Sequence, residues 1–234
     1  MIQIQALKTD PVCRFTARPD TSDIKAIEEV FKKKSYQRKD FRVGSGESWL
    51  DLGANVGAFS VYARSKGNRV CAVEAEATNH QILQQNLAVN EFHDVQTYRA
   101  AVVHDDFEGD HITFYVNSRP MALRRHSIYQ PKKDFQAVDV PVIRWSSLPF
   151  DQYPCVKMNI EGAEIDLLEH AKSFHGIQKL VFEYSWDKDP SIARFKAILD
   201  KLRGHFRYVD HNKRLPQTPN WTFYPPNIFV FCMA

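Results

Sequence analysis

One turn constrains the fold of this chain more than any other feature, the segment 48–60 (SWLDLGANVGAFS). A short apolar run carries Asp51 near its end, a loop bounded by Gly53 and Gly57 follows, and a helical pattern begins. Gly53 lets the chain turn sharply and lets a ligand approach the backbone. Gly57 lets the new helix pack closely, and the first amides of that helix are free to bind a ligand. This pattern predicts the strand–turn–helix unit of a nucleotide-binding α/β sheet.

The spacing within the turn separates two classes of cofactor. A dinucleotide-binding turn reads G-x-G-x-x-G, because a pyrophosphate lies on its amides. Here the spacing is D-x-G-x-x-x-G, and Asp51 would repel a pyrophosphate. The same carboxylate would attract a ligand that carries an ammonium and a sulfonium group. S-adenosylmethionine carries both, so we expect this cofactor rather than NAD; the alternative is an ordinary turn that binds nothing.

A second acid supports the prediction of a nucleotide pocket. Residues 69–74 (RVCAVE) are typical of a buried strand, and Glu74 ends it. An acid at this strand end accepts hydrogen bonds from ribose hydroxyls. We therefore predict that the cofactor contacts Glu74 and the following residues of the first two units: Asp51, Gly53, Asn55, Gly57, Phe59 and Asn79, with Ala101 from the third strand.

The rest of the chain predicts alternating strands and helices with one interruption. Strands are expected at 49–53, 69–74, 95–103, 155–160 and 179–184, and helices at 23–34, 57–66, 77–90, 163–173 and 191–202. Residues 206–209 and 228–232 are expected to form an antiparallel edge pair, with the Pro-rich stretch 216–226 between them. These elements predict a Rossmann-like α/β fold with a seven-stranded, mostly parallel sheet and an antiparallel C-terminal edge strand. Residues 1–45 would form an N-terminal arm and helix beside the domain 46–234.

The interruption lies at 104–149, where we expect two extra strands, 112–116 and 138–143. We expect this insertion to recognise the acceptor, because loops on a rigid sheet commonly carry specificity. It includes the basic run 119–133, which holds five bases, no acid and His126. A second basic run, 32–42, is interpreted as the solvated face of a helix. Either run could instead hold an anionic acceptor or a nucleic-acid backbone.

Composition limits the cellular setting. The chain has 234 residues, of which 44% are hydrophobic, enough for one sizeable core. No apolar run approaches the roughly 20 residues of a membrane helix, and no signal-peptide pattern is seen. The four cysteines lack metal-type spacing and are expected to be reduced. We therefore expect a cytoplasmic protein that does not insert into membranes.

The strand at 155–160 and the residue that follows it carry three of the candidate catalytic residues. Lys157, Asn159 and Glu161 share a parity and could point to one face, beyond which an α/β sheet binds its ligands. A buried lysine needs a partner, for which Glu183 is a candidate. No metal is predicted, although Asn159, Glu161 and Glu183 have oxygen atoms that could bind one.

Three segments together resemble the FkbM-type methyltransferases: DLGANVG at 51–57, VEAEATN at 73–79 and KMNIEGAE at 157–164. The family pattern runs D-x-GAN-x-G, VEPxPxN and K-I-D-[IV]-EGAE. The resemblance implies a Rossmann-like O-methyltransferase that depends on S-adenosylmethionine and acts on hydroxyls of natural products or sugars. Ala75 and Ala77 stand where the family has prolines, and Asn159 stands where it has Asp.

The Asn159 departure matters because an amide cannot act as a general base at neutral pH. Glu161, His126 and Lys157 are the remaining candidate bases, and Glu161 is preferred; His126 is expected at a loop surface. Three functions stay open: methylation of a hydroxyl on a sugar or other small molecule, 2'-O methylation of RNA ribose using the basic runs, and a non-catalytic module that binds S-adenosylmethionine and another protein.

Overall fold

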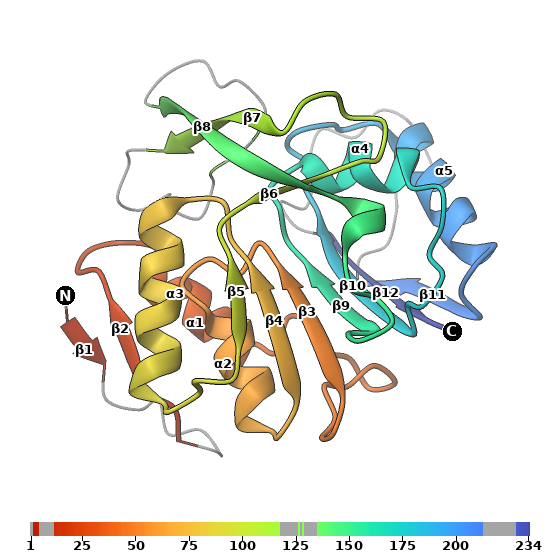
Figure 1. Cartoon of the computed structure of the whole chain (residues 1–234). Coiled ribbons are helices and arrows are strands. Elements are labelled where there is room, and N and C mark those ends of the chain that lie inside the picture. Colours follow the sequence, from red (N-terminus) through yellow and green to blue (C-terminus); the bar gives the residue numbers. More distant parts are fainter. Residues whose placement is uncertain (1, 5–11, 118–125, 127, 129–134, 213–227) are drawn as a thin grey trace.

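The chain folds around a seven-stranded sheet (Figure 1). The computed structural model describes residues 2–4, 12–117, 126, 128, 135–212 and 228–234. In spatial order the strands are β11 (Tyr208–His211), β12 (Ile228–Met233), β10 (Lys179–Tyr184), β9 (Cys155–Met158), β3 (Ser48–Leu52), β4 (Arg69–Val73) and β5 (Gln96–Tyr98).

Five neighbouring strands of this sheet, β10 to β5, run parallel. Strand β12 runs antiparallel to both β10 and β11. The predicted Rossmann-like fold, its seven strands and its C-terminal antiparallel pair are therefore confirmed. The strand that runs in the opposite direction, β12, lies one place inside the edge, and β11 forms the edge itself.

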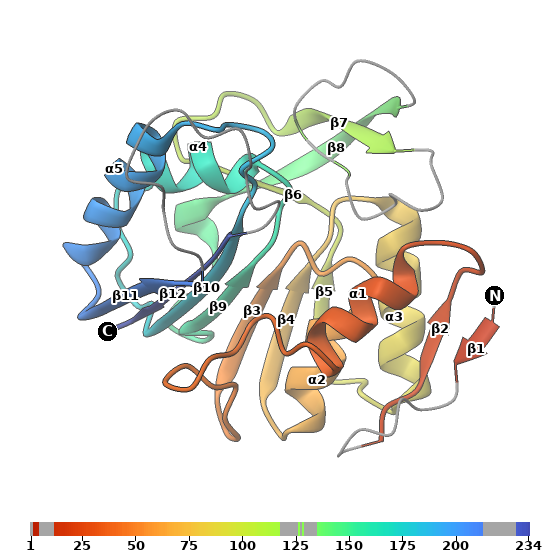
Figure 2. The same ribbon diagram turned by 180° about the vertical axis from the view of Figure 1, so that it is seen from behind.

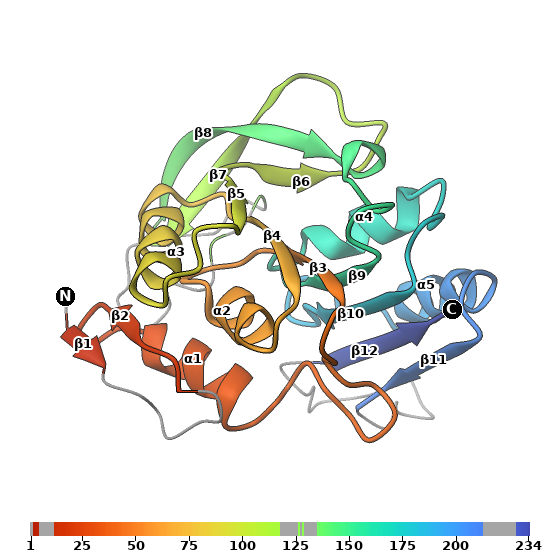
Figure 3. The ribbon, with the colours of Figure 1, turned by 60° about the horizontal axis from the view of Figure 1, so that its bottom comes forward.

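Helices cover both faces of the sheet (Figure 3). Helices α1 (Asp23–Phe31), α2 (Ala58–Ser65) and α3 (Ala77–Val89) pack their buried side chains into one hydrophobic cluster. Helices α4 (Ala163–His170) and α5 (Ile192–Arg203) pack into a second cluster on the other face, which also takes the 3₁₀ turn Trp145–Ser147. Because both faces are covered, successive residues of the central strands β3, β4, β9 and β10 are buried, whichever face of the sheet they point to.

A second, three-stranded sheet lies above the carboxyl ends of the parallel strands (Figure 1). Its order is β6 (Ala101–Val103), β8 (Phe135–Arg144) and β7 (His111–Asn117). The predicted single strand 95–103 is thus wrong, because it divides into β5 and β6. The division occurs where Glu74 holds both sides of the break: its N–H donates to the carbonyl of Tyr98, and its carbonyl accepts from the N–H of Ala100. After Ala100 the chain joins the second sheet.

The N-terminal part packs on the same core (Figure 2). Strands β1 (Ile2–Ile4) and β2 (Phe15–Ala17) pair antiparallel, an arrangement the sequence does not predict. Asn86 of α3 holds β2 by accepting a hydrogen bond from the N–H of Thr16 and donating one to its carbonyl. Residues predicted as an arm therefore contact the helix that follows Glu74.

The basic run 32–42 is not the face of a helix, because α1 ends at Phe31. Lys32 pairs with Glu28, and Arg38 pairs with Asp210 on the edge strand β11. Of the other basic run, 119–133, only His126 and Ile128 are among the described residues, and the stretch 216–226 lies outside them. In the described part of the chain, every helix is too short or too polar to cross a membrane.

Candidate functional site

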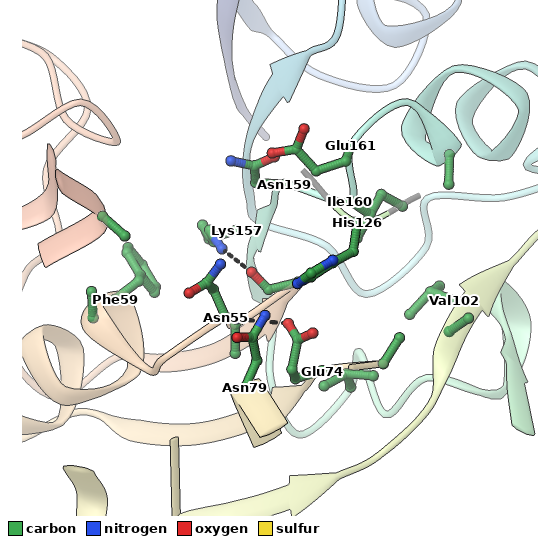
Figure 4. A pocket seen from close by; sticks show the side chains of 18 of the residues that line it. Asn55, Phe59, Glu74, Asn79, Val102, His126, Lys157, Asn159, Ile160 and Glu161 are labelled. Carbon is green, nitrogen blue, oxygen red and sulfur yellow. Dashed lines mark hydrogen bonds between the residues drawn. The ribbon is translucent and has the colours of Figure 1, made fainter. Parts of the chain in front are cut away.

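A cavity of about 860 Å³, its open mouth included, lies where β3, β4 and β9 end. Its walls come from the turns after these strands, from α1 and the segment that follows it, and from the second sheet. Figure 4 shows the labelled side chains that face it. Ten of the twelve predicted site residues line the cavity; Asp51 and Gly57 do not.

Asp51 is buried and already paired. One carboxylate oxygen accepts a hydrogen bond from the Lys157 ammonium at 2.8 Å, and the other accepts one from the Ser60 hydroxyl at 2.6 Å. The expectation that Asp51 faces a cationic ligand is therefore wrong. Its partner Lys157 stands opposite it in the register of β3 and β9, which sequence spacing does not reveal.

The two glycines of the turn serve packing. A Cβ on Gly53, whose φ is +72°, would lie 1.8 Å from the carbonyl oxygen of Asn159. A Cβ on Gly57, whose φ is +84°, would lie 2.6 Å from a methyl of Leu83 on α3. Gly53 thus lets the ends of β3 and β9 approach each other, and Gly57 brings α2 against α3.

Glu74 has the position predicted for it, at the end of β4. Its carboxylate is buried and accepts hydrogen bonds from the N–H of Asn55 at 2.7 Å and of Glu76 at 2.9 Å. Burial raises the pKa of Glu74 to about 7. Each carboxylate oxygen keeps a lone pair beyond these bonds, so the side chain can still accept two hydroxyl donors from a ligand.

Asn79 lies beside Glu74 and is fixed by a residue that sequence reasoning missed. Arg18, itself held in a bidentate pair by Asp23, donates to the Asn79 side-chain oxygen at 2.7 Å. That contact leaves the Asn79 amide nitrogen buried without a partner. The preceding helix cap, Glu76, accepts the backbone N–H of Asn79. No pattern in the sequence links Arg18 to this turn, because 61 positions separate the two residues.

The sequence suggested Glu183 as the partner of Lys157, but the ion pair that Lys157 forms is with Asp51. Besides Asp51, its ammonium donates to the Gly53 carbonyl at 2.9 Å, and it lies 5.3 Å from the ring centre of Tyr36. An ammonium whose protons are engaged in this way has no lone pair with which to accept a proton. Lys157 therefore ties β9 to the turn after β3.

Asn159 takes the partner expected for Lys157. Its amide nitrogen donates to the Glu183 carboxylate at 2.8 Å and to the Tyr36 hydroxyl at 3.2 Å. Its amide oxygen is buried and has no partner. Tyr36, a second residue missed from the sequence, is buried, and burial raises the pKa of its hydroxyl well above the usual value. Its ring meets that of Phe59 edge-on at 5.7 Å.

Glu161 lines the cavity just beyond the end of β9, in a left-handed backbone conformation with φ +53°. Such a conformation is costly for a residue other than glycine and is often kept at functional positions. The following turn is fixed by Glu164, whose buried carboxylate accepts the N–H groups of Gly162 and Ser185. The strain therefore persists because the surrounding hydrogen bonds hold it.

His126 is buried in the cavity wall, contrary to the surface position expected of a loop histidine. Its Nδ1 accepts a hydrogen bond from the N–H of Asn117 at 2.8 Å, and its Nε2 has no partner. Burial lowers the pKa of His126 to about 4. The imidazole is therefore neutral near pH 7 and carries its proton on Nε2, which suits a hydrogen-bond donor rather than a base.

The described residues hold no cluster of three or more His, Cys, Asp or Glu side chains arranged for a metal ion. All four cysteines are buried and free. Among the described residues, the polar side chains that line the cavity are carboxylates, amides, one tyrosine, one lysine and one neutral histidine.

Comparisons with known proteins agree with this geometry. Residues 51–209 match the model of the methyltransferase FkbM domain. No curated protein matches the chain. Among solved structures, the tRNA (uracil-54, C5)-methyltransferase of Pyrococcus abyssi, in complex with S-adenosyl-L-homocysteine, has a TM-score of 0.50 at 13% identity, over 100% of this chain and 44% of that one.

A second structure, the precorrin-6y C5,15-methyltransferase of Geobacter metallireducens, has a TM-score of 0.46 at 11% identity, over 94% of this chain and 92% of that one. At such identities the likeness to solved structures shows the fold alone. The family is shown by the match to the FkbM domain, which covers more than half of the chain. The protein therefore belongs to the FkbM family of methyltransferases.

Proposed function

We propose that the protein binds S-adenosylmethionine in this cavity and transfers its methyl group to a hydroxyl of a sugar or other small molecule. The observation that carries the proposal is Glu74, a buried carboxylate at the end of β4 with acceptor capacity left for two ribose hydroxyls. Three orphaned polar atoms fit a ligand as well: the Asn79 amide nitrogen, the His126 Nε2 and the Asn159 amide oxygen. Buried polar atoms are rarely left without partners, so a polar ligand would satisfy them.

The charges of the cavity favour a cationic ligand. Among the described residues that line it, Glu29, Glu74 and Glu161 are acidic, and the Lys157 ammonium is already paired with Asp51. An excess of carboxylates attracts a sulfonium and opposes a pyrophosphate. It also favours a neutral acceptor over an anionic one. The role first expected of Asp51 thus passes to carboxylates that actually line the cavity.

Glu161 is the proposed general base. When bound, S-adenosylmethionine supplies an electrophilic methyl group on a positively charged sulfur. Glu161 would receive the proton that the acceptor hydroxyl loses as its oxygen takes the methyl group, whose bond to sulfur breaks so that S-adenosylhomocysteine leaves. The orphaned oxygen of Asn159 can accept a hydrogen bond from that hydroxyl and so aim it, without taking the proton. Holding the reacting atoms in line would supply much of the rate enhancement, about 7–11 kcal/mol.

The nucleic-acid alternative has less support. In the basic run 32–42, the charges of Lys32 and Arg38 are engaged by acidic partners. Capped RNA and oligonucleotides nevertheless belong in the test, since Lys33, Lys34 and Lys39 of the same run are exposed.

The test is a transfer assay with S-adenosylmethionine labelled on its methyl group, against sugars, nucleosides, capped RNA and oligonucleotides. We expect label in a small hydroxyl compound, with little dependence on salt. Label in RNA that falls steeply between low and physiological salt would instead favour the nucleic-acid function. Binding of S-adenosylhomocysteine without transfer to any acceptor would favour the non-catalytic module.

The matched variant is Glu161→Gln, which keeps the size of the side chain and removes its basicity. We expect the transfer rate to fall about 10²–10⁴-fold while the affinity for S-adenosylhomocysteine stays within twofold. An unchanged rate would exclude Glu161 as the base but would not count against the proposal that the protein transfers a methyl group.

A further inference from the structure

His126 is the most unusual polar group of the cavity, because it is fixed in place yet lacks half of its hydrogen bonds. Only 6% of its surface is exposed. The N–H of Asn117, the last residue of β7, donates to Nδ1 and thereby places the proton of the neutral ring on Nε2. That Nε2–H group is buried without a partner. A buried donor without an acceptor costs free energy of folding. A ligand that places an acceptor atom at this point would remove that cost and so bind more tightly.

The surroundings of His126 place it at the Glu74 end of the cavity. The charged groups that act on the imidazole are Glu76 and Arg18. Both residues contact Asn79. Glu76 accepts a hydrogen bond from the backbone N–H of Asn79, and Arg18 donates one to the side-chain oxygen of Asn79. Figure 4 shows His126 among the labelled side chains that face the cavity together with Glu74 and Asn79.

An apolar wall stands beside this donor. Ala75, Ala101 and Phe114 belong to one small hydrophobic cluster, against which Ile128 packs, and all four line the cavity. The rings of Phe114 and His126 are 6.3 Å apart between centroids. The two alanines and the phenylalanine therefore form an apolar part of the cavity wall close to a single N–H donor. A planar heteroaromatic ring with an acceptor nitrogen at its edge matches this combination.

We propose that the Nε2–H of His126 donates a hydrogen bond to a ring nitrogen of the adenine of the methyl donor, with the ring held against Ala75, Ala101 and Phe114. The inference rests on the proposed function, since it presumes an adenosine-containing ligand whose ribose is bound by Glu74. It assigns His126 to cofactor binding rather than to proton transfer. It also gives β7 of the inserted segment a part in holding the cofactor, in addition to any contact with the acceptor.

Two variants separate the role of Nε2 as a donor to the ligand from the role of Nδ1, which accepts the hydrogen bond of Asn117. In His126→Asn the side-chain oxygen can replace Nδ1 as the acceptor for Asn117, but no donor reaches the position of Nε2. In His126→Gln the longer amide can place an N–H group there. By calorimetry we expect S-adenosylhomocysteine to bind His126→Asn about 10–100-fold more weakly than wild type, and His126→Gln to recover part of that loss.

The ligand can be varied as well, which keeps the test valid even if a variant folds poorly. The wild type is titrated with S-adenosylhomocysteine analogues in which ring nitrogen N1, N3 or N7 is replaced by CH. We expect one analogue to lose about as much affinity as His126→Asn does, and to lose nothing further when it binds that variant.

The inference is overturned if all three analogues bind the wild type as tightly as the parent compound. It is also overturned if His126→Asn binds S-adenosylhomocysteine within twofold of wild type, which together with a raised KM for the acceptor would assign His126 to the acceptor. A wild type that does not bind S-adenosylhomocysteine at all refutes the proposed function itself, a different result from binding that ignores His126.

Discussion

The ammonium of Lys157 lies 2.8 Å from the carboxylate of Asp51, and both side chains are buried in the middle of the parallel sheet. The two residues stand opposite each other on β9 and β3. Lys157 also donates to the carbonyl of Gly53, in the turn that opens into the cavity. Asp51 and Lys157 therefore form one structural link, which fixes the turn after β3.

Removing either Lys157 or Asp51 should strongly destabilise the fold. Lys157→Met leaves the Asp51 charge buried with only the Ser60 hydroxyl as a partner, so we expect a loss of about 3–5 kcal/mol in the free energy of unfolding. Urea titration measures it. The control is Lys172→Met, which breaks the exposed pair with Asp106 and should cost at most about 1 kcal/mol. Equal effects of the two substitutions would contradict the structural role of Lys157.

Gly53 should tolerate no side chain. In Gly53→Ala the new Cβ meets the backbone oxygen of Asn159, so β3 and β9 would have to separate. Gly67 is the matched control: its φ is +81°, but a Cβ there meets nothing within 4 Å. We expect Gly67→Ala to cost about 1–2 kcal/mol for its backbone alone, and Gly53→Ala to cost several times more or to prevent folding. Similar unfolding midpoints would show that backbone conformation, not contact, makes Gly53 necessary.

Glu74 should make the unliganded protein less stable as pH rises. Its pKa in the folded protein is about 7, above the value near 4.3 of an unfolded chain, so the folded state binds more protons between these values. Stability is therefore highest below the unfolded pKa and falls as pH rises through about 7. Compared with Glu74→Gln, the wild type should lose about 2 kcal/mol between pH 5.5 and pH 8 in urea titrations. A pH dependence shared by both proteins would mean that another group is responsible.

The sequence predicts most of the fold because its signals are local. The apolar strands, the glycines of the first turn and the acid that ends β4 all act within a few positions of each other. What it misses depends on contacts between distant segments. The partner of Lys157 follows from the register of two strands. The division of 95–103 follows from the pairing of β6 with β8 in a second sheet. The burial of His126 and the reach of Arg18 to Asn79 depend on how β7 and the N-terminal segment pack, which no periodicity encodes.

The replacement of the family's Asp by Asn159 should be linked to Glu183. In Asn159→Asp two buried carboxylates would meet where an amide now donates at 2.8 Å, so they would have to share a proton. We expect this variant to lose stability between pH 5.5 and pH 8 more steeply than wild type. The double variant Asn159→Asp/Glu183→Gln exchanges the donor and the acceptor and should recover the wild-type slope. If the steep pH dependence of stability persisted in the double variant, it would not arise from the contact between residues 159 and 183.

The central claim is that the cavity binds the adenosine of a methyl donor through Glu74, and calorimetry tests it most directly. Wild type and Glu74→Ala are titrated with S-adenosylhomocysteine and, separately, with NAD. We expect the wild type to bind S-adenosylhomocysteine and not NAD, and Glu74→Ala to bind it at least about tenfold more weakly, because two hydrogen bonds to a charged acceptor are lost. No binding of S-adenosylhomocysteine to the wild type, or equal affinity in the two proteins, would contradict the account.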